Sequence, residues 1–163
     1  MITLEPFRPD HLAQVRALVN VHLGALAPGW AVPEVLIASQ IKRNPGEYIV
    51  DPWVIARTTV CAIEQQRVVA VGHLLRYGAG PEVSRFCNNI GAIDWIFAWP
   101  DAGEAAAALL AAAQRQFAAW GVRQEWVDAG ALVGRSPACR MSGHISRRPS
   151  VRQAISPTRG ATR

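Results

Sequence analysis

The chain alternates between segments with the two-residue repeat of a strand and segments with the three-to-four-residue repeat of a helix. The most apolar segment, residues 92–99, is followed by Pro100 and by an alanine-rich segment whose apolar residues recur at helical spacing. Both faces of residues 92–99 are apolar, which is typical of a strand covered on two sides. With another strand expected over residues 123–128, the pattern predicts two parallel strands joined by a right-handed helical crossover.

The sequence before this crossover predicts two helices and three more strands. In chain order they are a strand over residues 2–8, a helix that begins near Pro9, a helix from Pro33 to Ile41, and a hairpin of strands over residues 54–63 and 67–77 that turns at Gln65 and Gln66. The inner stripe of the first helix comprises Leu12, Val15, Leu18, Val19, His22 and Leu23. The order β-α-α-β-β-β-α-β predicts an α/β fold, a mixed sheet flanked by helices.

The alanine-rich helix carries its own start and stop signals. Pro100 ends the preceding strand because it has no N–H to donate. Asp101 stands at the expected N-cap, with Glu104 three residues later. The pair predicts a capping box, in which each side chain accepts a hydrogen bond from a free backbone N–H. Gly121 is the expected end of the helix because glycine adopts a positive φ without strain.

The charge of the chain is divided between two regions. The full sequence has a net charge of +5, but residues 1–132 contain ten Lys and Arg against twelve Asp and Glu. Residues 133–163 contain seven Arg, five Ser and three Pro, with no acidic and no aromatic residue. Such a segment cannot bury enough apolar surface to offset its ordering entropy. We therefore expect a folded domain over residues 1–132 and a disordered basic tail over residues 133–163.

The boundary near Leu132 is abrupt, and we expect the domain before it to lack its last strands. The break resembles translation of a GC-rich gene in a shifted reading frame, a hypothesis that an intact downstream frame in the parent locus would support. The arginines of the tail predict salt-sensitive, non-specific contact with nucleic acid. If residues 123–128 form the last strand, its exposed edge favours a homodimer.

Composition excludes several classes of protein. The first residues carry acids and prolines in place of the basic end and apolar core of a secretory signal. The longest apolar run, residues 105–113, has nine residues, far too few to span a membrane. We therefore expect a cytoplasmic protein without a membrane partner. The three cysteines lie far apart with no Cys-x-x-Cys pair, so neither a disulfide framework nor a metal site is expected.

The element order resembles that of the GNAT superfamily of N-acetyltransferases over roughly residues 2–131. The segments RPDHLAQVRALVN and EQQRVVAVGHLLRYG are also similar to the family in pattern. The resemblance implies that acetyl-CoA binds where the fourth and fifth strands splay apart, with its pyrophosphate at the N-terminus of the next helix, where free N–H groups stabilise an anion. The implied cofactor-binding residues are Trp95, Ile96, Phe97 and Ala98, by backbone pairing with the pantetheine, and Gly103, Glu104, Ala105 and Ala106, near the pyrophosphate.

The phosphate loop departs from the pattern of the family. The usual order is Gln or Arg, two residues, Gly, one residue, then Gly or Ala. Alignment on the two leucines of the helix places Asp101 on the first position, Glu104 on the first glycine and Ala106 on the last position. Two carboxylates beside a phosphate weaken its binding. The resemblance therefore implies an acetyltransferase of weak or no activity, and the alternative is a capped helix with no ligand.

Asp94 is the acidic residue of the central strand and the candidate catalytic residue, a general base that takes a proton from the acceptor amine. On a regular strand it shares a face with Ile96 and Ala98, where burial would raise its pKa. The alternative is that Asp94 caps the strand end and binds backbone. The common acid of the family is a tyrosine after the fifth strand, but Tyr48 and Tyr77 both lie upstream.

Two further side chains have competing interpretations. His73 alternates with apolar residues, so we expect a hydrogen-bonded core histidine rather than a catalytic one. Trp30, in the loop over residues 28–33, would border the acceptor site under the family resemblance, but packing of its ring on the sheet is the favoured interpretation.

The sequence thus supports two functions of different class. The first is transfer of an acetyl group from acetyl-CoA to the amine of a small molecule or peptide. The second is a truncated or degenerate acetyltransferase-like domain that is not catalytic and acts as an interaction module. Binding of acetyl-CoA distinguishes them, because a ligand of the native state raises its stability.

Overall fold

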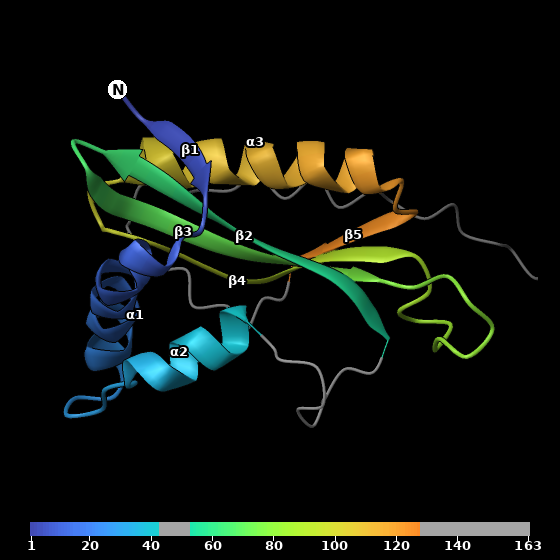
Figure 1. Cartoon of the computed structure of the whole chain (residues 1–163), viewed down its shortest axis with the longest axis horizontal. Helices are drawn as coiled ribbons and strands as arrows, with labels where there is room; N and C mark the ends of the chain where they lie inside the picture. The colour runs from blue at the N-terminus through green and yellow to red at the C-terminus, as the bar shows by residue number, and fades with distance from the viewer. Residues whose placement is uncertain (43–52, 128–163) are drawn as a thin grey trace, which may run out of the picture.

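A five-stranded sheet, with its strands side by side in chain order, forms the centre of the molecule (Figure 1). The computed structural model describes residues 1–42 and 53–127, and the structural statements below concern those residues. The strands are β1 (Thr3–Pro6), β2 (Val54–Glu64), β3 (Arg67–Tyr77), β4 (Ile90–Ala98) and β5 (Gln124–Val127). Neighbours pair antiparallel from β1 to β4, and β5 pairs parallel with β4. The predicted α/β class and the predicted parallel pair are confirmed.

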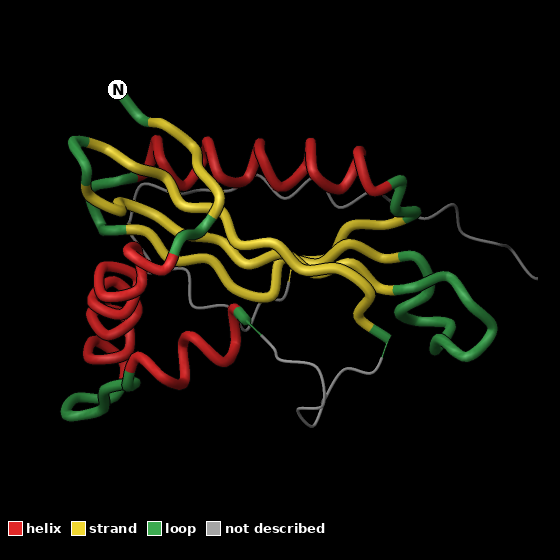
Figure 2. Tube along the Cα trace, in the orientation of Figure 1, coloured by secondary structure: helices red, strands yellow, loops and turns green. Residues whose placement is uncertain are grey.

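Helices cover both faces of this sheet. The helical elements are the short η1 (Pro9–His11), α1 (Leu12–Leu26), α2 (Glu34–Ile41) and α3 (Gly103–Trp120). Figure 2 shows α3 along one face, with α1 and α2 against the other. The predicted order of elements is therefore confirmed. No helix among the described residues is long and apolar enough to cross a membrane.

The two faces of the sheet bury separate apolar cores. Under α3, the core is built from Ala62, Val69, Ala70, Leu74, Ile93, Ile96, Ala105, Leu109, Ala113 and Phe117. Under α1 and α2, it is built from Val15, Leu18, Val19, Ile37, Cys61, Val68 and Val71, with Trp95 and Phe97 packed against them. Burial on both sides explains why β4 reads as a nearly continuous apolar run. The inner stripe predicted for the first helix is likewise buried or partly buried.

Two turns follow the predicted chemistry. Gln65 and Gln66 join β2 to β3 with φ of 48° and 64°, the pair of positive values that a tight two-residue hairpin requires. Gly121 ends α3 with a φ of 63° and donates its N–H to the Ala118 and Phe117 carbonyls. Both predictions, a hairpin turn at the glutamines and a glycine helix end, are confirmed.

The start of α3 differs from the prediction. The N-cap is Ala102, and no side chain caps the helix, so the predicted capping box of Asp101 and Glu104 is wrong. The reason is a turn after β4, in which the Ala102 N–H donates to the Trp99 carbonyl at 2.9 Å. This turn moves the helix start one residue beyond Asp101, so that both acidic side chains are exposed.

The predicted tail over residues 133–163, its boundary near Leu132 and the reading-frame hypothesis lie outside the described residues. Within the described part of the chain, β5 is the edge strand next to β4. Pairing of two copies through that edge, and contact of the tail with nucleic acid, stay predictions.

Candidate active site

An extra residue divides β4 into two halves. Leu74 of β3 lies opposite Ile93, and the next residue towards the N-terminus of β3, His73, lies opposite Trp95. Asp94 is therefore the inserted residue of a β-bulge. Because of this insertion, Ile93 and Ile96 both pack in the core under α3, three positions apart, whereas Trp95 packs on the α1 side. Side chains thus alternate regularly on each side of Asp94, but the bulge shifts the alternation of the two halves by one residue.

The two halves also differ in their neighbours. β5 pairs with Ile90 through Ile93, and among the described residues no strand pairs with the outer edge of β4 beyond the bulge. Within residues 1–42 and 53–127, the parallel pair therefore ends at Ile93, just before Asp94; we call this point the fork, and the edge of β4 beyond it the open edge. This geometry places the predicted catalytic residue at the fork, with the four predicted pantetheine-binding residues following it along the open edge. Asp94 is half-buried in the middle of β4, so the alternative that it caps the strand end is wrong.

The hydrogen bonds to β3 identify which backbone groups face the opening. The Trp99 N–H donates to the Val69 carbonyl at 3.0 Å, continuing the register of the ladder. Bonded and non-bonded pairs alternate along an antiparallel ladder. The backbone groups of Trp95 and Phe97 therefore face β3, and those of Ile96 and Ala98 face the opening.

A histidine from α1 reaches this open edge. His22 donates from its Nε2 atom to the Ala98 carbonyl oxygen at 2.7 Å, and its ring lies 5.5 Å from that of Phe97. The sequence placed His22 on the inner stripe of the helix without a role. The available signal was its polarity, because a buried imidazole requires a hydrogen-bond partner.

A second histidine lies beside the bulge on the same face. His73 is buried, its Nδ1 atom lies 2.7 Å from the Thr59 hydroxyl, and its ring stacks on that of Trp95 at 5.3 Å. The prediction of a hydrogen-bonded core histidine is confirmed. The stacking of His73 on Trp95 was not visible in the sequence, because it depends on the register shift at Asp94.

The N-terminus of α3 follows directly from the open half of β4. Gly103, Glu104 and Ala105 form its first turn, and the Ala106 N–H makes the first helical bond, to the Ala102 carbonyl at 3.1 Å. A Cβ atom on Gly103 would meet no atom within 4 Å, so the backbone here faces open space. An uncapped first turn offers N–H groups and the positive end of the helix dipole to an anion. The exposed carboxylates of Asp101 and Glu104 oppose that attraction.

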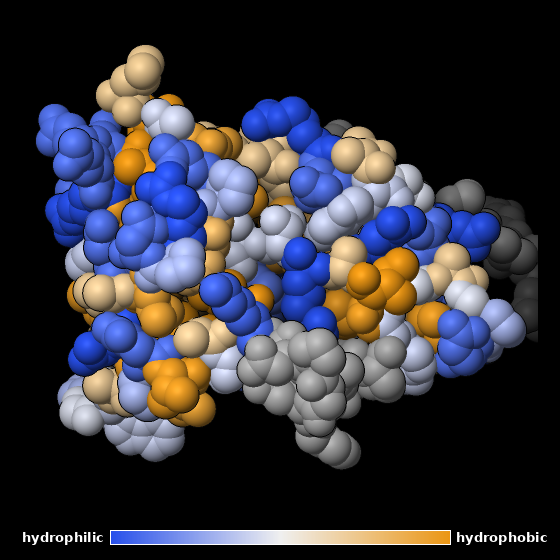
Figure 3. All heavy atoms as spheres, viewed as in Figure 1, coloured by the Kyte–Doolittle hydropathy of each residue, from blue (hydrophilic) through white to orange (hydrophobic). Residues whose placement is uncertain are grey.

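The loop between α1 and α2 is held in place by paired hydrogen bonds. The Asn20 amide donates to the Val32 carbonyl at 3.1 Å and accepts from the Val32 N–H at 2.7 Å. Trp30, within this loop, is 74% exposed, so the favoured interpretation that its ring packs on the sheet is wrong. Exposed apolar residues continue onto α2, where Figure 3 shows orange surface atoms at the lower left, and include Val35 and Leu36.

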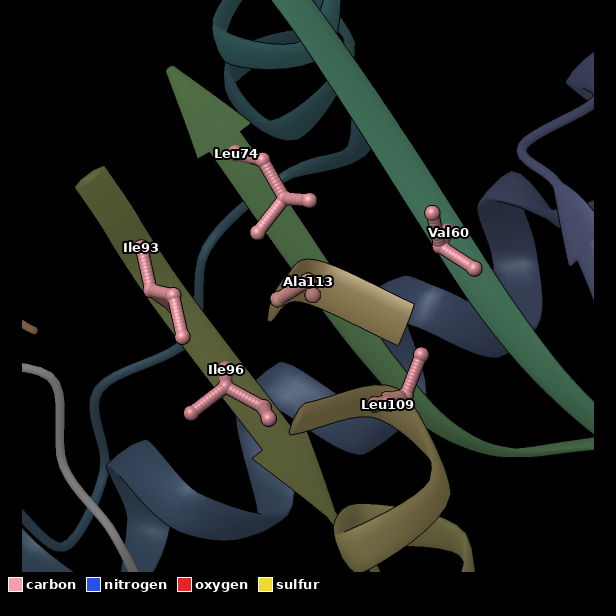
Figure 4. A pocket seen from close by; sticks show the side chains of 7 residues that line it. Val60, Leu74, Ile93, Ile96, Leu109 and Ala113 are labelled. Carbon is pink, nitrogen blue, oxygen red and sulfur yellow. The ribbon is translucent and has the colours of Figure 1, made fainter. Parts of the chain in front are cut away.

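A cavity under α3 does not contribute to this site. Its volume is about 10 Å³, and Figure 4 shows Leu109 and Ala113 of α3 facing the side chains of the sheet across it. The residues that line it are Val60, Gly72, Leu74, Ile93, Ile96, Leu109 and Ala113. The lining is apolar and the volume is near that of one water probe, so the cavity is a packing defect rather than a ligand site. Within the described residues, no three His, Cys, Asp or Glu side chains could together hold a metal ion.

Comparison with known proteins identifies the fold. The sequence matches no protein-family model and no curated protein. The structure is similar to ribosomal-protein-alanine N-acetyltransferase from Brucella melitensis biovar Abortus 2308, with a TM-score of 0.59, 12% identity, and coverage of 99% of this chain and 100% of that one. It is also similar to a GNAT family acetyltransferase from Staphylococcus aureus, with a TM-score of 0.54, 10% identity, and coverage of 99% and 97%.

A third similar structure was determined with a ligand. It is AAC(6')-Iy in complex with the bisubstrate analogue CoA-S-monomethyl-acetylneamine, with a TM-score of 0.53, 17% identity, and coverage of 98% of this chain and 99% of that one. At these identities the comparisons concern the fold. The fold is that of the GNAT acetyltransferases, as the sequence resemblance implied.

Proposed function

We propose that this protein transfers an acetyl group from acetyl-CoA to an amine. The observation that carries the proposal is the fork in the sheet at Asp94, which opens towards an uncapped N-terminus of α3. A structural neighbour with this fold was solved with a CoA bisubstrate analogue. The sequence argument adds a cytoplasmic setting. The acceptor is a small-molecule or peptide amine.

The open edge of β4 offers the groups that a pantetheine arm needs. The arm contains amides, which pair with backbone N–H and C=O groups as a neighbouring strand does. Of the four residues predicted to bind it, Ile96 and Ala98 present backbone groups to the opening. Trp95 and Phe97 contribute through their rings, which support the strand on the α1 side.

The first turn of α3 is the proposed site of the pyrophosphate. Its N–H groups, on Gly103, Glu104 and Ala105, are not used by a side-chain cap. Ala105 also fixes the helix to the core, because its side chain is buried. The two carboxylates nearby make this a weak site, which is why low activity is part of the proposal.

Asp94 is the proposed general base. It would take a proton from the acceptor amine as the amine nitrogen attacks the carbonyl carbon of the thioester. The new C–N bond forms, the C–S bond breaks, and CoA leaves as the thiol after a proton is returned to its sulfur. The tethered loop that carries Trp30 borders the acceptor in this arrangement, since it extends from the same helix, α1, that reaches the open edge of β4.

Calorimetric titration with acetyl-CoA tests the proposal. We expect micromolar or weaker binding and a matching rise in the melting temperature, and we expect desulfo-CoA to bind similarly, because the phosphates and the pantetheine arm supply the contacts. Absence of binding at millimolar acetyl-CoA would reject the enzyme and favour the alternative, a non-catalytic interaction module. That alternative is favoured by the placement of Asp101 and Glu104.

Replacement of the general base separates binding from chemistry. In an assay of CoA release with a panel of amines, D94N should bind acetyl-CoA with unchanged affinity and lose activity by about 10²- to 10⁴-fold, the usual contribution of a general base. Equal activity of D94N and the wild type would remove Asp94 from the mechanism while leaving the cofactor site intact.

A further inference from the structure

We propose that His22 is a positioning residue for the pantetheine arm of acetyl-CoA, acting through its hydrogen bond to the Ala98 carbonyl. The inference rests on the proposed function and extends it to a residue outside β4 and α3. His22 does not touch the cofactor in this proposal. It fixes the orientation of the edge to which the cofactor binds.

The His22 side chain is held in one orientation by burial, a hydrogen bond and a ring contact. The imidazole is 9% exposed and lies on the buried stripe of α1, whose other buried residues, Val15, Leu18 and Val19, are aliphatic. Its Nε2 atom is 2.7 Å from the Ala98 oxygen, a short distance for such a bond. The ring also contacts Phe97, which limits its rotation. Helix, ring and strand edge are therefore coupled at one point.

The carbonyl that His22 binds belongs to the open edge. Ala98 lies in a non-bonded position of the ladder with β3, so its backbone groups point away from that strand. In a continuous sheet, a neighbouring strand would donate to this carbonyl. Since a part-buried acceptor without a partner is costly, the donor from α1 takes the place of that strand at Ala98.

The hydrogen bond also determines which backbone donors and acceptors of β4 remain available to the cofactor. With the Ala98 oxygen held by His22, the edge presents the Ala98 N–H and the N–H and carbonyl of Ile96. These are two donors and one acceptor at strand spacing, which is a pattern that a chain of amides complements. Loss of the imidazole would leave the Ala98 oxygen without this donor and change the pattern of donors and acceptors that the amides of the cofactor meet.

The test compares matched histidine variants for binding of CoA by calorimetry. H22A should bind about tenfold more weakly than the wild type, which corresponds to about 1.4 kcal/mol. H22Q should recover most of that loss, because its side-chain amide can donate from a similar distance. H11A is the control: His11 is also buried, accepts from the Arg8 N–H at 3.2 Å and contacts the Phe7 ring, but lies away from β4.

The outcomes are distinguishable. If the wild type binds CoA and H22A binds as tightly as H11A, the role of His22 is refuted while the proposed function stands. If the wild type does not bind CoA, the proposed function fails and the role of His22 fails with it. If H22A does not fold, ¹⁵N NMR spectra of the histidine side chains of the wild type test the role of His22 instead. Addition of CoA should shift the His22 Nε2 signal and leave that of His11 in place, and an unshifted His22 signal would overturn the proposal.

Discussion

The two halves of β4 are both apolar but have different neighbours. The half before Asp94 is closed: β5 pairs with its outer edge and Gly91 lies directly beneath the Phe117 ring. No strand among the described residues pairs with the outer edge of the half after Asp94, and at Ala98 that edge receives a side chain from α1. Apolar composition therefore determines the burial of a strand but not what its edge binds. That depends on which neighbour is present.

The largest expected effect is a loss of stability where α3 packs on the closed half of β4. Phe117 is 1% exposed and is the largest fully buried side chain of the described core. F117A should lower the free energy of unfolding by about 3–5 kcal/mol, because it removes a ring and leaves a cavity. Urea denaturation measures this loss. A loss below about 1 kcal/mol, well under the usual range of about 3–5 kcal/mol for this substitution, would show that α3 is not packed on Gly91 as described.

A smaller loss of stability is expected from adding a side chain at Gly91, which overfills the core where F117A would leave a cavity. A Cβ atom there would lie 2.5 Å from Cδ1 of Phe117, so the helix or the ring must move. G91A should cost about 1–3 kcal/mol, the usual range for overpacking. The control is the same substitution combined with F117L, which makes room for the methyl group, so the two changes should be non-additive. Additive effects would contradict the contact.

The third prediction concerns the charge near the proposed phosphate site, beyond the open half of β4. Neutralising both acids near the proposed phosphate site, as D101N with E104Q, should tighten CoA binding by about three- to thirty-fold, from the usual size of charge effects at a helix N-terminus. The gain should shrink as salt is raised, since screening weakens exposed charges. E82Q, an exposed acid in the loop before β4, is the control and should change nothing. Equal affinity of the double variant and the wild type would place the phosphates elsewhere.

The smallest expected effect is a stabilisation. Gly72 lies in β3 beside the open half and lines the small cavity, and a Cβ atom there would meet its nearest neighbour, Cγ1 of Ile96, at 3.9 Å. G72A should raise the free energy of unfolding by about 0.4–1 kcal/mol, because the methyl group fits and the unfolded chain loses freedom. A decrease in the urea midpoint would show that the strand needs glycine at this position.

Periodic features of the fold could be predicted from the sequence, whereas the single-residue bulge in β4 could not. The stripe of α1, the hairpin at Gln65 and Gln66 and the parallel pair around α3 follow from periodicity and turn chemistry, and all are confirmed. A bulge inserts a single residue and has no periodic signature, so the regular alternation expected around Asp94 could not reveal it. The capping box failed because a turn at Trp99 shifted the helix start, and that turn depends on where β4 ends.

The candidate site was predictable in outline and not in detail. The resemblance of the fold implied a site at the edge of β4 and the first turn of α3, and binding there stays a prediction. It could not identify His22, because a polar residue on an apolar stripe indicates only that some partner exists. Nor could it place Trp30, because burial of a loop side chain depends on the path of the loop, which here is fixed by Asn20 and Val32.

The bulge has a consequence for the length of the chain. Trp95 through Ala98 already lie opposite β3 as though Asp94 were absent, so a polypeptide shortened by that one residue would keep the same side chains on the same faces. Folding therefore does not require the bulge residue, and we expect the fold to tolerate deletion of Asp94.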